Sequence, residues 1–181
     1  MKQALAQDTA PCATPMIRQV EVPQGDLCVS DHPREEMVAT LGSCVSVCLF
    51  DPRSGIGGMN HIFQNVSSEP YGDAGVIAEV ERLINALMHR GVPRDHLAAR
   101  VAGGAQVLLK GRRHGLAIAQ ACLTFLERER VPILGISIGG QRARRVRFHP
   151  ATGRLLVATF AYTGQADPPL PKAPRNGPEM F

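Results

Sequence analysis

The sequence predicts a mixed fold of helices and strands (α+β), and three observations support this. Short apolar runs bounded by glycine, proline and aspartate recur along the chain, which is typical of strands. Two stretches, near residues 73–88 and 115–130, repeat apolar residues at helical spacing. The chain has 181 residues, of which 44% are hydrophobic and 20% charged, so one domain can bury a core without disulfides or metals.

The two ends of the chain differ in composition from the middle. Residues 1–16 are mostly small and polar with two prolines, and residues 164–181 contain five prolines. Proline resists both helix and sheet. We therefore expect a flexible N-terminal segment at 1–16, a folded domain at 17–163 and a disordered tail at 164–181.

Three strands with a break and a turn between them are expected first. They cover residues 37–41, 44–50 and 59–63, with Gly42-Ser43 after the first and a turn at 51–55 before the third. The alternation of Val45, Val47 and Leu49 predicts that the second strand is half-buried. Strands joined by a tight turn run antiparallel, so Cys44 and His61 are expected side by side at one end of the pair.

The first helix is the clearest element of the chain. Asp73 is a good N-cap, apolar residues follow at i, i+3 and i+4, and Gly91 is placed to end the helix. The second helix, near 115–130, is expected to pack the thiol of Cys122 into the core. Further strands are expected at residues 98–102, 133–138, 144–148 and 155–160, the last two forming a hairpin.

Cysteine content and charge limit the classes of function. The five cysteines are odd in number and include no CxxC pair, and neither a signal peptide nor an apolar stretch of ~18 residues is present. This pattern predicts a cytoplasmic protein without membrane insertion. The net charge of +4 is carried mostly by arginine, which suits an acidic partner. Base-stacking aromatic residues are missing beside the basic runs, so no nucleic-acid partner is expected. A small domain without heptads favours a monomer.

The thiol of Cys44 is the strongest candidate for chemistry. It follows a glycine-containing break between strands, where a nucleophile is presented and backbone N–H groups are free to hold an oxyanion. A thiol with a pKa of ~8.5 needs a base beside it, and His61 lies on the adjoining strand. On spacing alone, a buried structural cysteine and a structural histidine are the more common reading.

A metal site is the local alternative. Cys44, Cys48 and His61 supply three ligand types, but residues four apart on a strand lie ~13 Å from one another, and a fourth ligand is missing. We therefore expect no metal and no cofactor.

The residues around Cys44 and His61 resemble a known family. The run from Leu41 to Pro52, followed by Gly57-Gly58-Met59-Asn60-His61, closely resembles CheD, the chemoreceptor glutamine deamidase family. The similarity continues through Gly103-Gly104, Gly139-Gly140 and Thr152-Gly153. The resemblance implies a layered α/β/β fold, a β-sandwich with helices packed on one side. It also implies Cys44 as nucleophile and His61 as its base.

The resemblance further implies a substrate and a third catalytic residue. The substrate would be specific glutamines on the cytoplasmic domain of methyl-accepting chemotaxis receptors, which become glutamates. The family's threonine matches Val38, and Thr40, two residues on and so on the same strand face, is expected to replace it. Backbone N–H groups at Gly42, Ser43 and Cys44 are expected to hold the oxyanion. The alternatives are a receptor glutamyl methylesterase and a binding module that regulates a CheC-type phosphatase.

A basic run later in the chain has two readings. Arg142, Arg144, Arg145 and Arg147 most often indicate a solvated strand edge. The alternative is a docking surface for an acidic receptor helix.

Overall fold

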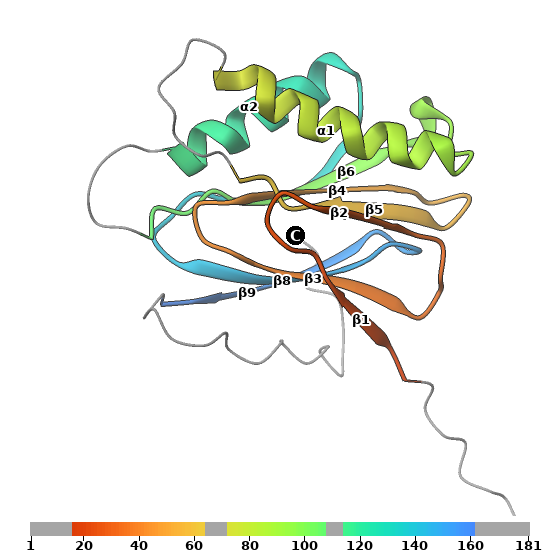
Figure 1. Cartoon of the computed structure of the whole chain (residues 1–181), viewed down its shortest axis with the longest axis horizontal. Coiled ribbons are helices and arrows are strands. Elements are labelled where there is room, and N and C mark those ends of the chain that lie inside the picture. Colours follow the sequence, from red (N-terminus) through yellow and green to blue (C-terminus); the bar gives the residue numbers. More distant parts are fainter. Residues whose placement is uncertain (1–15, 64–71, 108–113, 162–181) are drawn as a thin grey trace, which may run out of the picture.

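The computed structural model describes residues 16–63, 72–107 and 114–161 (Figure 1). The predicted flexible segments at 1–16 and 164–181 lie outside these residues, apart from Met16, as do residues 162–163 of the predicted domain. The elements, in chain order, are β1 Arg18–Glu21, β2 Leu27–Ser30, β3 Glu35–Leu41, β4 Val45–Asp51, β5 Ile56–Asn60, α1 Gly72–His89, the 3₁₀ turn η1 Arg94–His96, β6 Ala98–Gly103, α2 His114–Arg128, β7 Ile133–Ile138, β8 Ala143–His149 and β9 Arg154–Phe160.

The predicted α+β class and the layered α/β/β architecture are confirmed. The strands form a four-stranded sheet in the order β1-β3-β8-β9 and a five-stranded sheet in the order β2-β5-β4-β6-β7. Figure 1 shows the two sheets stacked face to face, with α1 and α2 covering the outer face of the five-stranded sheet. Neither helix in the described part of the chain combines the length and apolar character needed to cross a membrane.

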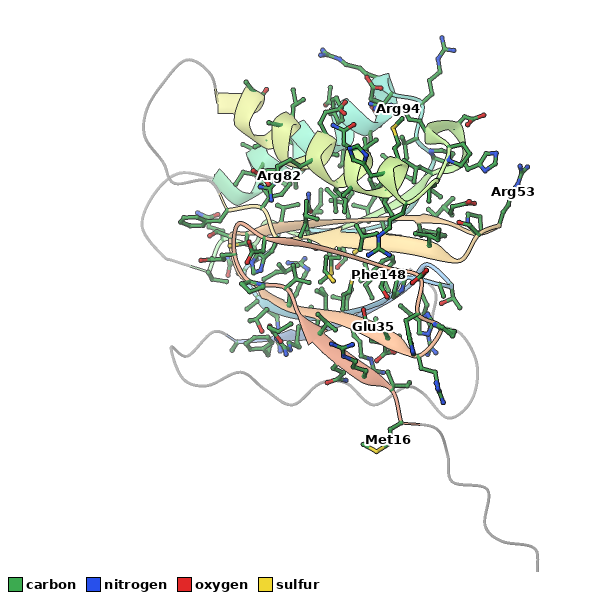
Figure 2. The ribbon with its side chains drawn as sticks, turned by 45° about the vertical axis from the view of Figure 1, so that its right-hand side comes forward. Met16, Glu35, Arg53, Arg82, Arg94 and Phe148 are labelled. Atoms are coloured by element: carbon green, nitrogen blue, oxygen red, sulfur yellow. The ribbon has the colours of Figure 1, made fainter. Side chains whose placement is uncertain are left out.

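Two separate cores hold the three layers together. One lies between the helices and the five-stranded sheet and includes Val47 and Leu49 of β4. The other lies between the two sheets and includes Cys48 and Phe50 of the same strand, together with Phe148 (Figure 2). Strand β4 is therefore buried along its whole length, and the prediction of a half-buried strand was wrong. Alternation of apolar with other residues usually predicts a strand with one solvent-exposed face. It also occurs where different layers cover the two faces of the strand.

Three connections cross from one sheet to the other at the same end of the sandwich. They join β1 to β2, β3 to β4 and β7 to β8. Because β1 runs parallel to β3, residues 22–26 and 42–44 emerge side by side. Val45, where β4 begins, pairs with Gly103, where β6 ends, and Gly103 pairs with Ile138 at the end of β7. This end of the sandwich therefore collects Cys44 and His61 with two of the Gly-Gly segments, Gly103-Gly104 and Gly139-Gly140.

The strand predicted at residues 59–63 starts earlier than expected. Strand β5 runs from Ile56 to Asn60 and contains Gly57 and Gly58, while His61 follows its end. A Cβ atom on Gly57 would lie 2.7 Å from the carbonyl oxygen of Pro150, and one on Gly58 would lie 2.7 Å from that of Cys28. The glycines are thus positions of close packing inside a strand and do not break it.

The helices match the prediction except at one cap. The second helix, α2, covers the expected residues and buries Cys122, and Gly91 follows α1 with a φ of 88°. Asp73 lies in the first turn of α1 and is not its N-cap. A carboxylate in that turn still interacts favourably with the helix dipole.

The strands differ from the prediction in two places. Strand β7 was expected to be buried, but it is an edge strand in which Leu134 and Ile136 are exposed. The short strands β1 and β2 were not predicted, because four residues are too few for a periodic pattern to show.

A pair of glycine substitutions tests the packing of β5. Gly58→Ala is expected to lower the free energy of unfolding by about 1–3 kcal/mol, since the new methyl group overpacks the contact with β2. Gly75→Ala is the control, because a Cβ there meets no atom within 4 Å and alanine favours the helix by roughly 0.5–1 kcal/mol. Urea unfolding followed by circular dichroism measures both. Equal stability of the two variants would contradict the packing described for Gly58.

Candidate functional site

Cys44 lies at the corner where the chain passes from β3 to β4, at the left of the sandwich in Figure 1. Its carbonyl oxygen accepts a hydrogen bond from Gly104 N–H at 2.7 Å, and that of Gly42 accepts one from Ala105 N–H at 2.8 Å. The N–H group of Ser43 has no acceptor among the described residues, and the N–H group of Cys44 interacts with the thiol of the same residue. The corner therefore turns its carbonyls inward and leaves two amide donors beside the thiol.

Glycines on two other elements allow the chain to come this close to the corner. A Cβ on Gly103 would collide with the carbonyl of Cys44, and one on Gly115, in the first turn of α2, would lie 2.7 Å from the carbonyl oxygen of Ser43. Gly103 and Gly104 both have positive φ values, 115° and 65°. Gly103 and Gly104 therefore help to support the chain at the Cys44 corner.

His61 is held in one orientation by the connection from β1 to β2. Its backbone N–H donates to Asp26 O at 3.0 Å, and its carbonyl accepts from Gly25 N–H at 2.9 Å. On the ring, Nδ1 lies 2.9 Å from the carbonyl oxygen of Val22. A carbonyl only accepts, so Nδ1 carries the proton and Nε2 carries the lone pair. Nε2 is buried and has no hydrogen-bond partner among the described residues.

Strand register brings Cys44 and His61 to the same face. Val45 and Ile62, the residues that follow them, exchange two backbone hydrogen bonds of 3.1 and 2.7 Å. Both point toward the helices, so alternation turns Cys44 and His61 toward the four-stranded sheet. The two residues are diagonal neighbours across the antiparallel pair, a separation that a ring side chain can span. Both are nearly inaccessible, at 5% and 6% exposure.

The thiol and the imidazole are each pushed toward their neutral form. Burial raises the pKa of the Cys44 thiol above its ordinary value, and a hydrogen bond from the side chain of Gln24 opposes this. Burial lowers the pKa of His61 below its ordinary value, opposed by the Val22 carbonyl and the charge of Glu21. Both effects disfavour a preformed thiolate–imidazolium pair at neutral pH. The neutral imidazole is then a base rather than a fixed cation.

Two residues of this site, Val22 and Gln24, had no place in the sequence prediction. Val22 orients His61, and Gln24 Nε2 donates to Cys44 Sγ at 2.9 Å. The only local signal is the turn composition of Pro23-Gln24-Gly25-Asp26, where Asp26 N–H donates to Pro23 O and Gly25 has a φ of 81°. That signal predicts a turn but not the thiol next to it.

The structure does not bring Thr40 to the pair. Its hydroxyl accepts a hydrogen bond from Arg145 at 2.9 Å, while its neighbours Ala39 and Leu41 pack between the sheets with Cys44. Alternation along β3 thus places Thr40 on the opposite face of the four-stranded sheet. Val38, the match to the family's threonine, shares that face and approaches the site only through its carbonyl, which accepts from Val22 N–H at 2.9 Å.

The arginine run is mostly engaged inside the molecule. Arg144 and Arg145 are buried; the first donates to Gly139 O, and the second forms a two-fold hydrogen-bonded ion pair with Glu21. Arg147 forms an ion pair with Glu36 at 3.1 Å. Only Arg142 of the four is exposed. The surface that these arginines could offer to a partner is therefore limited to Arg142 and the exposed edges of the residues beside it.

Two other thiols, those of Cys48 and Cys122, are less suited to reaction. Cys48 and Cys122 are fully buried, and burial raises the pKa of each thiol to about 12. Among residues 16–63, 72–107 and 114–161, no three histidine, cysteine, aspartate or glutamate side chains form a group that could hold a metal ion.

The fold and the site define a class: a two-sheet α+β sandwich with a buried thiol–imidazole pair at one end. Within that class, this chain belongs to the CheD family. The family described as CheD chemotactic sensory transduction matches residues 61–159. A protein from Caulobacter sp. (strain K31) named probable chemoreceptor glutamine deamidase CheD is 40% identical, over 94% of this chain and 92% of its own.

Other relatives have similar names. The probable chemoreceptor glutamine deamidase CheD of Caulobacter vibrioides (strain NA1000 / CB15N) is 34% identical, over 90% of this chain and 93% of its own. Among solved structures, the Bacillus licheniformis hypothetical protein YfiH overlays at a TM-score of 0.45 with 13% identity, covering 67% of this chain and 60% of its own.

The state of His61 is directly measurable. We expect ¹⁵N NMR to show a protonated Nδ1 and an unprotonated Nε2, because only the first has an acceptor. The ring is expected to titrate with a midpoint below its ordinary value of 6.5, since burial lowers its pKa. A His61→Asn variant assigns the signals. An Nε2–H tautomer, or a midpoint above 6.5, would contradict the geometry.

Proposed function

We propose that this chain is a protein-glutamine deamidase that converts glutamines on the cytoplasmic domain of chemoreceptors to glutamates. Cys44 is the nucleophile in this proposal and His61 its base, acting in the cytoplasm without a cofactor. Membership of the CheD family and the names of the relatives support the substrate and the reaction.

One observation carries the catalytic assignment: the buried, unpartnered Nε2 of His61, with Nδ1 held by Val22. A buried nitrogen without a partner costs stability, typically about 1–3 kcal/mol. A structural histidine would be expected to satisfy both nitrogens. A free lone pair on the face that carries Cys44 is what a general base requires.

The reaction follows from these positions. His61 Nε2 takes the proton of the Cys44 thiol, and Sγ attacks the side-chain carbonyl carbon of the glutamine. The oxyanion that forms accepts hydrogen bonds from the amides at Ser43 and Cys44. The first has no acceptor among the described residues, and the second faces the thiol of its own residue. Nε2–H then protonates the amide nitrogen, the C–N bond breaks and ammonia leaves. Water, activated by His61, hydrolyses the thioester and releases a glutamate side chain and the free thiol.

Val22 takes the place in this mechanism of the third catalytic residue, for which the family resemblance pointed to Thr40. A third catalytic member holds the base in one tautomer and stabilises its charged form. The Val22 carbonyl meets both needs, since it accepts from Nδ1 and raises the pKa of His61 against the effect of burial. This mechanism therefore needs no catalytic side chain at position 38 or 40.

Mass spectrometry of a receptor fragment tests the proposal. We expect wild-type protein to increase the mass of particular glutamine peptides by the amide-to-acid change, and Cys44→Ala to leave them unchanged because no thioester can form. Cys48→Ala is the matched control, a buried cysteine on the same strand face, and should retain turnover.

Three outcomes separate the candidates. Turnover by Cys44→Ala would contradict the nucleophile. Release of methanol from a methylated fragment, with glutamines untouched, would indicate the methylesterase. An inactive folded wild type that still binds a CheC-type phosphatase would indicate the binding module.

A further inference from the structure

We propose that Gln24 is a further catalytic residue, whose side-chain amide donates a hydrogen bond to the oxyanion formed on Cys44. This inference rests on the proposed deamidation. It adds a side-chain donor, supplied by the connection between β1 and β2, to the two backbone donors at the β3–β4 corner.

The contact that carries the inference is between Gln24 Nε2 and Cys44 Sγ, 2.9 Å apart. No other described side chain is seen to hydrogen bond to this sulfur. A carboxamide nitrogen is a donor with two hydrogens and no lone pair to accept with. It therefore stabilises negative charge on the atom that it faces. That atom is first the thiolate sulfur and then the substrate oxygen, once the sulfur has bonded to the carbon that carries this oxygen.

The change of partner during the reaction requires little movement. When Sγ bonds to the substrate carbon, its negative charge passes to the carbonyl oxygen, which is attached to that same carbon. A donor that faces Sγ thus already lies beside the position of the new charge. The amides at Ser43 and Cys44 lie on the backbone next to the same sulfur, so donors from two chain segments converge on one place.

The backbone of Gln24 is fixed although its side chain is exposed. It occupies the second position of a tight turn closed by the hydrogen bond from Asp26 N–H to Pro23 O at 3.1 Å. The next two residues hydrogen bond to the backbone of His61: Gly25 N–H donates to its carbonyl, and the Asp26 carbonyl accepts from its N–H. One short segment therefore positions both the base, through Val22, and the donor, through Gln24. The exposed side chain of Gln24 thus contacts a thiol that is itself nearly inaccessible.

The variants Gln24→Ala and Gln24→Glu test this role. The first removes the donor, and the second keeps the shape but replaces the donor with an acceptor that repels the oxyanion. Gln19→Ala is the matched control, an exposed glutamine on β1 that makes none of the contacts described for the site. Deamidation of the recombinant cytoplasmic fragment of a chemoreceptor from the same genome gives kcat and KM. Alkylation of Cys44 by iodoacetamide against pH gives the thiol titration without any substrate.

We expect kcat to fall by about 10²–10³ in Gln24→Ala, with KM changed little, because the lost bond is strongest in the transition state. Gln24→Glu should be at least as impaired, and Gln19→Ala should match the wild type. The alkylation midpoint should move to higher pH in Gln24→Ala, since the donor stabilises the thiolate. Unfolding in urea should be unchanged, which excludes a folding defect.

Two results would overturn the inference in different ways. If the wild type deamidates and Gln24→Ala keeps its full kcat, the proposed function stands and Gln24 is no donor to the oxyanion, even where the alkylation midpoint shifts. If the folded wild type leaves every glutamine intact, the proposed function fails and the inference fails with it.

Discussion

The hydrogen bond from His61 Nδ1 to the Val22 carbonyl is the contact on which the site depends, and it joins the two sheets. Val22 extends the four-stranded sheet, where its N–H bonds to Val38 of β3, and His61 follows β5 of the other sheet. A single bond of this kind contributes only about 0.5–1.5 kcal/mol. Its position therefore comes from the packing of the layers, and its effect is on the tautomer more than on stability.

The packing that sets this position is visible in how the chain changes sheets. The connections at 22–26 and 42–44 cross the sandwich at the same end because β1 and β3 are parallel. The apolar residues between the sheets, with Met37 and Phe148 among the largest, fix the separation that the two connections must span. Gly103 and Gly115 then pack closely against the connection at 42–44 and restrict it to one conformation. Two loops with no sequence relation are thereby held beside one thiol.

The electrostatics of the pair follow from the same burial. A thiol and an imidazole that lose water both shift toward neutrality, so burial disfavours an ion pair in the resting site. Such a pair becomes reactive when the proton passes between its members and other donors stabilise the negative charge. In this molecule the donors beside the sulfur come from the backbone of the corner and from Gln24.

The sequence by itself determined the two helices and most of the strands. It also determined the glycine-containing corner at Cys44 and the antiparallel segment that carries His61. Periodicity and turn composition are local, so they are readable without the fold. Tertiary structure decided what covers each face. It buried both faces of β4, turned Thr40 away from the thiol, engaged Arg144 and Arg145 internally and brought Val22 and Gln24 to the site. Those outcomes depend on which sheets stack and at which end the chain crosses, and no short stretch of sequence encodes that.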